Sequence, residues 1–249
     1  MAVIKKKSIC IIPARGGSKG IPGKNIKDFL GHPLIAWSII QARKSNVFQR
    51  VIVSTDDEHI ARVAVKYGAE VPFLRPESIA LDFSSTEEVL DHFVTWLYSS
   101  DAELPEQIVL LQPTSPVRNK KLIAGAVEDF LRSNSDSLLA VIESSIFLWR
   151  NESAPTPLYD FQDRPRRQDI PSADKVYRET GSLYIFTPSG FLKNKNRLHG
   201  RISFFVCDAS DGVDIDELSD WVAAEALYKK ILESPREGDY FKPCELEGC

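Results

Sequence analysis

Short apolar segments alternate with amphipathic stretches through the first 140 residues of the chain. The apolar segments are four or five residues long, as buried strands often are, and cover Ser8–Ile12, Val51–Ser54, Val71–Leu74, Ile108–Leu111 and Leu138–Ile142. Between them, apolar residues recur with helical spacing over Pro33–Lys44, Asp57–Tyr67, Thr86–Tyr98 and Lys120–Arg132. This alternation predicts an α/β fold with a mostly parallel sheet and helices on both faces.

Two helix starts carry recognisable capping residues. Ser85 followed by Glu88 matches a capping box, and Asp56 is expected to cap the helix that begins near Asp57. Both patterns support the predicted helix positions.

The alternation stops after Ile142. Residues 143–180 are rich in Pro, Ser, Asp and Arg and have no helical period, so we interpret them as an insertion that leaves the sheet toward a partner subunit. The pattern resumes with strands over Ser182–Thr187 and Ile202–Val206 and a final helix over Glu217–Leu232. Residues 236–249 are expected to form a loose tail.

Composition narrows the class of protein. A length of 249 residues suits a single domain, residues 1–249, that carries the small insertion. The net charge of −4 argues against a nucleic-acid-binding protein. The four cysteines form no CxxC pair, which favours a reducing compartment and indicates no zinc site. The basic run Lys5–Lys7 precedes an apolar segment too short for a signal peptide or a membrane span, so a cytoplasmic location is expected.

A glycine-rich loop follows the first strand, from Pro13 to Asn25. Its four glycines let backbone N–H groups approach an anion, and its positive charge comes from Arg15, Lys19 and Lys24. Ligands of doubly wound sheets bind at this edge, so we expect a polyphosphate here, although a flexible surface turn would have a similar composition. Ser18 and Asn25 exclude a Walker A loop, and no glycines have GxGxxG spacing.

Two further motifs follow later strands. The segment Gln112-Pro-Thr-Ser-Pro-Val-Arg118 exposes an amide and two hydroxyls that suit a polyhydroxylated sugar, or serves only as a capped helix entry. Asp214 and Asp216 alternate on an extended segment, so their carboxylates point to one side and could bind Mg²⁺. Asp216 could also cap the final helix.

In this order, the motifs resemble those of the acylneuraminate cytidylyltransferase (CMP-sialic acid synthetase) family, over roughly residues 8–232. The resemblance implies a Rossmann-like nucleotidyltransferase with a small dimerisation insertion, and a homodimer whose partner completes each site. It implies that CMP passes from CTP to the anomeric hydroxyl of a nonulosonic acid, an acidic nine-carbon sugar, and that pyrophosphate leaves. Mg²⁺ would be the cofactor, with neither nucleic acid nor a membrane as a partner.

The resemblance also assigns roles to residues at matching positions. Arg15 and Lys24 would be catalytic, and Asp214 and Asp216 would hold the metal. The nucleotide-binding residues would be Arg15, Gly16, Gly17, Lys24, Asn25, Arg75, Ser84, Ser85 and Thr86. The sugar-binding residues would be Gln112, Thr114, Ser115, Arg167 and Arg178.

Two departures from the family pattern leave the sugar open. Ser144–Phe147 stands where His-Pro is frequent, and Thr180 stands where Asn is common. The acid could be neuraminic, legionaminic, pseudaminic or deaminated. One alternative is a cytidylyltransferase for the shorter acid sugar Kdo, which Asn25 and the Arg167-Gln168 pair disfavour. Another is a non-catalytic nucleotide-binding protein, which would not need the two metal-binding aspartates.

Overall fold

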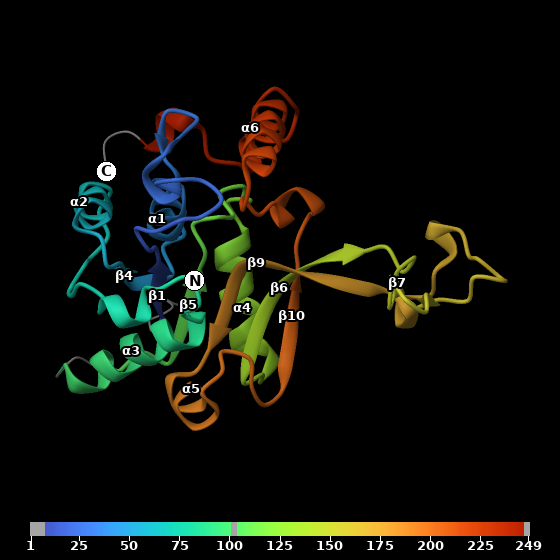
Figure 1. The fold of residues 1–249 in the computed structure, drawn as a ribbon, viewed down its shortest axis with the longest axis horizontal. Helices are drawn as coiled ribbons and strands as arrows, with labels where there is room; N and C mark the ends of the chain where they lie inside the picture. The colour runs from blue at the N-terminus through green and yellow to red at the C-terminus, as the bar shows by residue number, and fades with distance from the viewer. Residues whose placement is uncertain (1–7, 101–103, 247–249) are drawn as a thin grey trace.

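The computed structural model describes residues 8–100 and 104–246, so the basic run Lys5–Lys7 lies outside it (Figure 1). The central sheet has six strands in the order β10-β6-β9-β5-β1-β4. They are β1 (Ser8–Pro13), β4 (Phe48–Ser54), β5 (Gln107–Leu111), β6 (Ser137–Ser144), β9 (Val176–Phe186) and β10 (Ile202–Val206). Only β9 is antiparallel to its neighbours β5 and β6; the other neighbouring pairs are parallel. The predicted α/β class with a mostly parallel sheet is confirmed.

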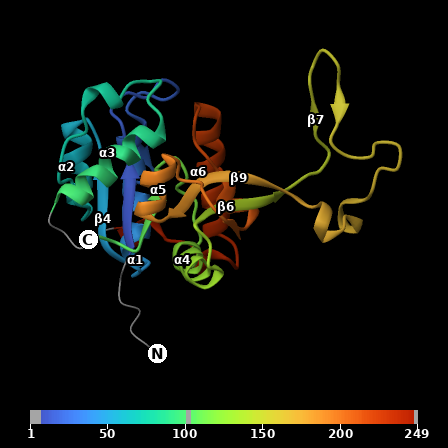
Figure 2. The same cartoon turned by 90° about the horizontal axis from the view of Figure 1, so that it is seen from below.

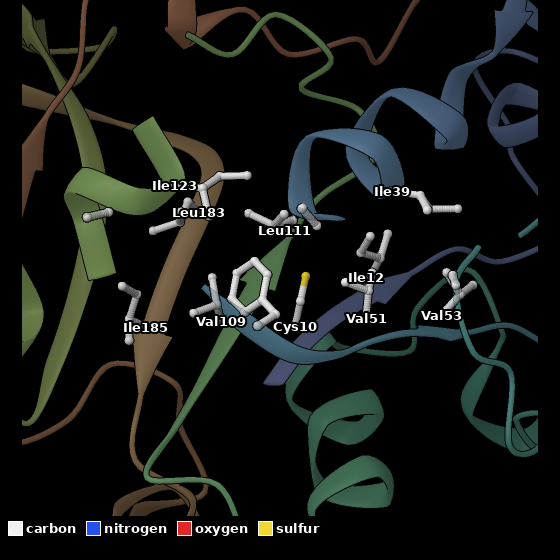
Figure 3. Packing of buried hydrophobic residues seen from close by; sticks show 14 of the residues in the cluster. Cys10, Ile12, Ile39, Val51, Val53, Val109, Leu111, Ile123, Leu183 and Ile185 are labelled. Atoms are coloured by element: carbon white, nitrogen blue, oxygen red, sulfur yellow. The ribbon is translucent and has the colours of Figure 1, made fainter. Parts of the chain in front are cut away.

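Helices cover both faces of this sheet, as Figure 1 and Figure 2 show. They are α1 (Leu34–Lys44), α2 (Glu58–Lys66), α3 (Thr86–Ser99), α4 (Leu122–Ser133), α5 (Pro188–Asn194) and α6 (Leu218–Leu232). Helices α1, α2 and α4 pack against strand residues such as Cys10 and Val109 (Figure 3). Helices α3 and α5 pack against Ile11 and Leu110. Successive strand side chains point to opposite faces, so β1 and β5 contribute to both cores.

Smaller elements connect these layers. Two-residue strands pair as β2 (Asp28–Phe29) with β3 (His32–Pro33) and as β7 (Trp149–Arg150) with β8 (Thr156–Pro157). Short 3₁₀ helices cover Lys24–Ile26, Glu77–Ile79, Arg167–Asp169, Ser172–Asp174, Ala209–Gly212, Glu237–Asp239 and Pro243–Leu246. Within the described residues, none of the helices has both the length and the apolar character that crossing a membrane requires.

One predicted strand is absent. Residues 71–74 make no ladder with β4, and only isolated bridges at Glu70 and Leu74 join this segment to the sheet. Pro72 lies between the two bridges and has no N–H to donate, so a continuous ladder cannot form there.

The capping predictions have mixed outcomes. The capping box of Ser85 and Glu88 is present at the start of α3. Asp57 rather than Asp56 caps α2, because its carboxylate accepts hydrogen bonds from the amides of His59 and Ile60. Asp56 is therefore free to contact other parts of the chain.

A third apolar cluster joins α6 and the C-terminal segment to α1. Tyr228 of α6 packs against Trp37 of α1, with ring centroids 4.9 Å apart. Three side chains near the chain end are buried in the same cluster: Tyr240, Phe241 and Leu246. The prediction of a loose tail over residues 236–249 is therefore wrong as far as residue 246, because these side chains complete a core. Residues 247–249 lie outside the described residues.

The insertion leaves the sheet as the composition predicts, but it is shorter. Strands β6 and β9 stay paired as far as Ser144 and Val176. The chain between them, residues 145–175, extends away from the body of the molecule and is called the arm below (Figure 1, Figure 2). Its aromatic rings pack on one another: Tyr159 lies 5.1 Å from Phe147 and 6.2 Å from Trp149, measured between ring centroids.

Candidate active site

A cleft of about 390 Å³ lies at the carboxyl ends of β1 and β5. The chain passes from β1 to β4 on one side and reaches β5 on the other, so this edge is a topological switch point, where open α/β sheets bind ligands. Most residues predicted for the site line this cleft, namely Arg15, Gly17, Lys24, Asn25, Arg75, Ser84, Ser85, Thr86, Gln112, Thr114, Asp214 and Asp216.

The glycine-rich loop is held in place by contacts from both sides. The amide of Gly16 donates to Asp56 Oδ1 at 3.1 Å, and Asn25 Nδ2 donates to the carbonyl of Arg15 at 3.0 Å. Gly20 lies against the backbone of Asp216, where an added Cβ would come within 2.2 Å of the carbonyl oxygen. Only glycine permits that approach, so the loop and the aspartate segment are packed as one unit.

Lys24 joins this loop to the predicted metal-binding pair. Its Nζ donates to the carbonyl of Ile215 at 2.7 Å and lies 3.3 Å from Asp216 Oδ1. The Lys24 side chain is 12% exposed, whereas that of Asp216 is 76% exposed. Asp214 Oδ1 is buried and has no hydrogen-bond partner among the described residues. The site thus holds one shielded cation beside two carboxylates.

The other two cations of the loop share one carboxylate. Asp82 Oδ1 lies 2.8 Å from Arg15 Nη1, and Asp82 Oδ2 lies 2.9 Å from Lys19 Nζ. The ammonium of Lys19 and the guanidinium of Arg15 lower the pKa of the Asp82 carboxyl. Asp82 therefore ties the loop to the segment that leads into α3.

Arg75 lies at the other end of the cleft and is buried, with 5% exposure. Burial lowers the pKa of Arg75, and the hydrogen bond to Asp56 at 3.4 Å opposes that shift. Arg75 Nε has no hydrogen-bond partner among the described residues. An unpartnered donor beside Ser84, Ser85 and Thr86 suits the acceptor atoms of a heterocyclic base.

Gln112 and Thr114 stand beside the two aspartates. The carbonyl of Thr114 accepts a hydrogen bond from the amide of Ile215 at 2.9 Å, which ties the end of β5 to the aspartate segment. Gly181 has φ +72°, and a Cβ there would lie 2.9 Å from Gln112 Oε1 and 3.6 Å from Asp214 Oδ2. The Gln112 amide and the Asp214 carboxylate therefore lie above the same glycine.

A sequence profile of the family described as cytidylyltransferase matches residues 9–222. The chain belongs to this cytidylyltransferase family. It is 37% identical over 233 residues to a pseudaminic acid cytidylyltransferase of Campylobacter jejuni. The alignment covers 92% of this chain and 99% of the relative. It is 34% identical to a CMP-N,N'-diacetyllegionaminic acid synthase of Legionella pneumophila, with 92% and 97% covered.

An N-acylneuraminate cytidylyltransferase of Escherichia coli is 31% identical, with 91% of this chain and 53% of that protein covered. These relatives confirm the resemblance to acylneuraminate cytidylyltransferases and identify the chain as a nucleotidyltransferase.

Solved structures agree on the fold of this cytidylyltransferase. A CMP:2-keto-3-deoxy-manno-octonic acid synthetase complexed with CTP superposes with a TM-score of 0.64 at 16% identity, covering 90% of this chain and 99% of that one. A 4-diphosphocytidyl-2C-methyl-D-erythritol synthase gives a TM-score of 0.67 at 12% identity, with the same shares covered. At these identities the likeness concerns the fold alone, and it confirms the Rossmann-like nucleotidyltransferase architecture.

Four predicted site residues of the cytidylyltransferase do not line the cleft. Gly16 and Ser115 lie next to lining residues, and Ser115 Oγ is buried without a partner among the described residues. Arg167 is in the arm and lines a separate cavity of about 230 Å³ with residues 143–145 and Ile170. Arg178 is exposed on β9 and donates to the carbonyl of Gly212 at 3.1 Å. Within one chain, neither arginine faces the cleft.

The sequence analysis did not predict that Asp56 and Asp82 contact residues of the cleft. Asp56 contacts Gly16 and Arg75, although its place before α2 indicates a helix cap. Asp82 lies in a loop with no periodic pattern, so its two cationic partners are known only from the folded chain. Asp216 is not the cap of α6: its amide donates to Asp220, and the capping box is formed by Glu217 and Asp220.

The residues present fit a magnesium ion that binds together with a nucleotide. Across residues 8–100 and 104–246, no three His, Cys, Asp or Glu side chains converge on one point. Asp214 and Asp216 thus supply at most two carboxylates. Mg²⁺ is commonly held by one or two carboxylates together with substrate phosphates and water, and Asp214 Oδ1 is an acceptor without a partner.

Proposed function

We propose that this cytidylyltransferase transfers CMP from CTP to the anomeric C2 hydroxyl of a nonulosonic acid, with release of pyrophosphate. One observation carries the proposal: Lys24 of the glycine-rich loop, the Asp214–Asp216 pair and the Gln112–Thr114 turn line one cleft. Groups suited to phosphates, a cation and sugar hydroxyls therefore meet where the two substrates would react. The names of relatives that cover nearly the whole chain support an acid sugar.

In this proposal the sugar hydroxyl attacks the α-phosphorus of CTP, and the bond to the bridging oxygen of pyrophosphate breaks. Such a step depends mainly on positioning and on stabilising charge. Arg15 and Lys24 would balance the phosphate charge, since both reach the cleft from the loop that follows β1. Binding of the triphosphate would replace Asp82 and Asp216 as their partners.

The two ends of the cleft would hold the two substrates. Arg75 with residues 84–86 would bind the cytidine, because donors and hydroxyls gather there. Gln112 and Thr114 would bind the sugar hydroxyls. Asp214 and Asp216 would hold the magnesium ion, which when bound supplies positive charge beside the phosphates.

We further propose a homodimer in which the arm reaches the second copy. The arm extends beyond the body (Figure 1), and its apolar side chains are exposed: Leu148, Trp149, Leu158 and Phe161. Exposed aromatic side chains are typical of protein interfaces. The Arg167 guanidinium has no hydrogen-bond or ion-pair partner among the described residues, so it is available for the carboxylate of a sugar in the partner's cleft.

Pyrophosphate release from CTP tests the proposed function. The assay is run with Mg²⁺ and with pseudaminic, legionaminic, neuraminic and deaminated acids, with Kdo, and without sugar, and the CMP-sugar is identified by mass spectrometry. Release that requires one of the nonulosonic acids supports the proposal, and Lys24→Met is the inactive control. Release with Kdo alone, or CTP binding without any turnover, would refute it.

A further inference from the structure

Arg118 ends the Gln112-to-Arg118 motif but does not itself line the cleft. Its side chain is fully buried, with 0% exposure. Its guanidinium donates five hydrogen bonds: from Nε to Ser182 Oγ at 2.8 Å, from Nη1 to Ser38 Oγ at 2.9 Å and Gln41 Oε1 at 3.0 Å, and from Nη2 to the carbonyls of Gln112 at 2.6 Å and Ser182 at 3.0 Å. A guanidinium has five N–H donors, so all of them are used.

All five acceptors are neutral. In the described part of the chain, no carboxylate lies within ion-pair distance of Arg118. Burial lowers the pKa of Arg118 to about 10, while more distant carboxylates, including Asp211 and Asp214, favour the charged form. The side chain is therefore a cation at neutral pH. A buried charge without a counterion is costly, and stability alone rarely explains one.

The hydrogen bonds of Arg118 converge on the floor of the cleft. The two carbonyls that share Nη2 belong to Gln112, at the end of β5, and to Ser182 of β9. Ser182 follows Gly181, the residue above which the Gln112 amide and the Asp214 carboxylate lie. Of the remaining acceptors, Ser182 Oγ is also on β9, and Ser38 Oγ and Gln41 Oε1 join this floor to α1. Arg118 thus joins three elements directly beneath the groups that face a ligand.

We propose that Arg118 is a positioning residue for the sugar end of the cleft. Its Nη2 atom holds the carbonyls of Gln112 and Ser182 at a fixed separation, and so sets where the Gln112 side-chain amide lies relative to Asp214. This inference rests on the proposed function, because it assigns the sugar to Gln112. The nucleotide end has its own supports, in which Arg118 takes no part: Asp56 with Gly16 and Arg75.

Arg118→Lys tests the proposal, because lysine keeps the charge but cannot form the five-bond fork. We expect KM for the sugar to rise at least about tenfold, while the Kd for CTP stays within about twofold. Hydrogen exchange is expected to speed up in peptides covering residues 107–118 and 176–187 and to stay unchanged in β1 and β4. Arg132→Lys is the matched control, since Arg132 is 66% exposed on α4 and pairs only with neighbours on its own helix.

A folded Arg118→Lys protein with unchanged sugar KM would overturn the proposal, and so would equal losses for CTP and sugar. If Arg118→Lys does not fold, Ser182→Ala removes only the acceptor of Nε. About a threefold rise in sugar KM then supports the proposal, and an unchanged value overturns it.

If wild-type protein uses no nonulosonic acid, the proposed function fails on its own. Faster exchange confined to the two peptides would still support the positioning of the floor, and uniform or unchanged exchange would overturn it.

Discussion

Lys24 and Asp216 form an ion pair of 3.3 Å although 192 residues separate them in the sequence. The pair joins the glycine-rich loop to the segment that precedes α6, and Gly20 packs on the backbone of Asp216 beside it. The cation and the carboxylate therefore form one electrostatic unit at the mouth of the cleft. A triphosphate that binds here with a metal ion, as proposed, would rearrange this unit.

Asp216→Asn is expected to lower kcat roughly 100-fold and to change the Kd for CTP much less. The proposed metal contact acts on phosphate charge during the reaction, whereas Arg15, Arg75 and residues 84–86 still hold the nucleotide. Pyrophosphate release gives kcat, and calorimetry gives the Kd. Asp129→Asn is the control, because it removes an exposed carboxylate of α4 that does not line the cleft. Equal losses in kcat and affinity would show that Asp216 mainly supports the fold.

Asp82→Asn is expected to tighten CTP binding by a few fold. Asp82 pairs with Arg15 and Lys19, so a nucleotide that binds Arg15 as proposed would compete with this carboxylate. Asp91→Asn is a matched control, since Asp91 is 43% exposed against 42% for Asp82 and pairs with Lys195 away from the cleft. Isothermal titration at two salt concentrations measures the effect. Weaker CTP binding in Asp82→Asn would mean instead that Asp82 contacts the nucleotide or its metal.

Asp211 is expected to make the protein less stable as the pH rises through about 6. Burial raises the pKa of its carboxyl to about 6, against hydrogen bonds from the Asn119 amide and the Tyr240 hydroxyl. The folded chain holds this proton more tightly than the unfolded chain, so the stabilisation is complete below about pH 4 and is lost as the pH rises through about 6.

Urea unfolding of wild type and Asp211→Asn at pH 4.5 and 7.5 checks this prediction. The difference in unfolding free energy between the two proteins should change by about 2 kcal/mol in favour of the variant at the higher pH. Asp129→Asn, an exposed change on α4, should show a constant difference from wild type. A constant difference for Asp211→Asn as well would contradict the prediction.

Replacing Trp149 and Phe161 together by Ser is expected to weaken the proposed dimer at least about 100-fold. These side chains are 52% and 53% exposed in the single chain, and their ring centroids lie 5.9 Å apart on the arm. Sedimentation equilibrium measures the dissociation constant. Val65→Ser on α2, at 58% exposure, is the control and should leave the dimer intact. A monomeric wild type, or a dimer unaffected by the double change, would refute the arm as the interface.

The five helices that the sequence predicts lie within about two residues of their expected bounds, whereas α5 (Pro188–Asn194) was not predicted. The helix expected over Pro33–Lys44 covers Leu34–Lys44, and that expected over Thr86–Tyr98 covers Thr86–Ser99. Strand direction could not be read, because an apolar run has the same pattern in either direction. Strand β9 is antiparallel to its neighbours. It has 11 residues and begins before the expected Ser182, because Val176–Glu179 also pair with β6.

The cleft could be predicted because its motifs directly follow strands, and the carboxyl ends of parallel strands share one edge. Lys24 and Asp216 were both expected there, and the structure brings them into contact. Asp56 and Asp82 could not be predicted, because their importance depends on which cations fold against them. Arg118 belonged to a recognised motif, but its complete burial is a tertiary property.

The C-terminal segment has a practical consequence for anyone who shortens this enzyme. Cutting the chain before Tyr240 would expose apolar side chains of α1 and α6, because Tyr240, Phe241 and Leu246 lie in their shared core. Helix α6 begins two residues after Asp216, so loosening this helix would also loosen the side of the cleft that Asp214 and Asp216 line. Such a truncation would thus disturb the proposed active site, although Tyr240, Phe241 and Leu246 do not line the cleft.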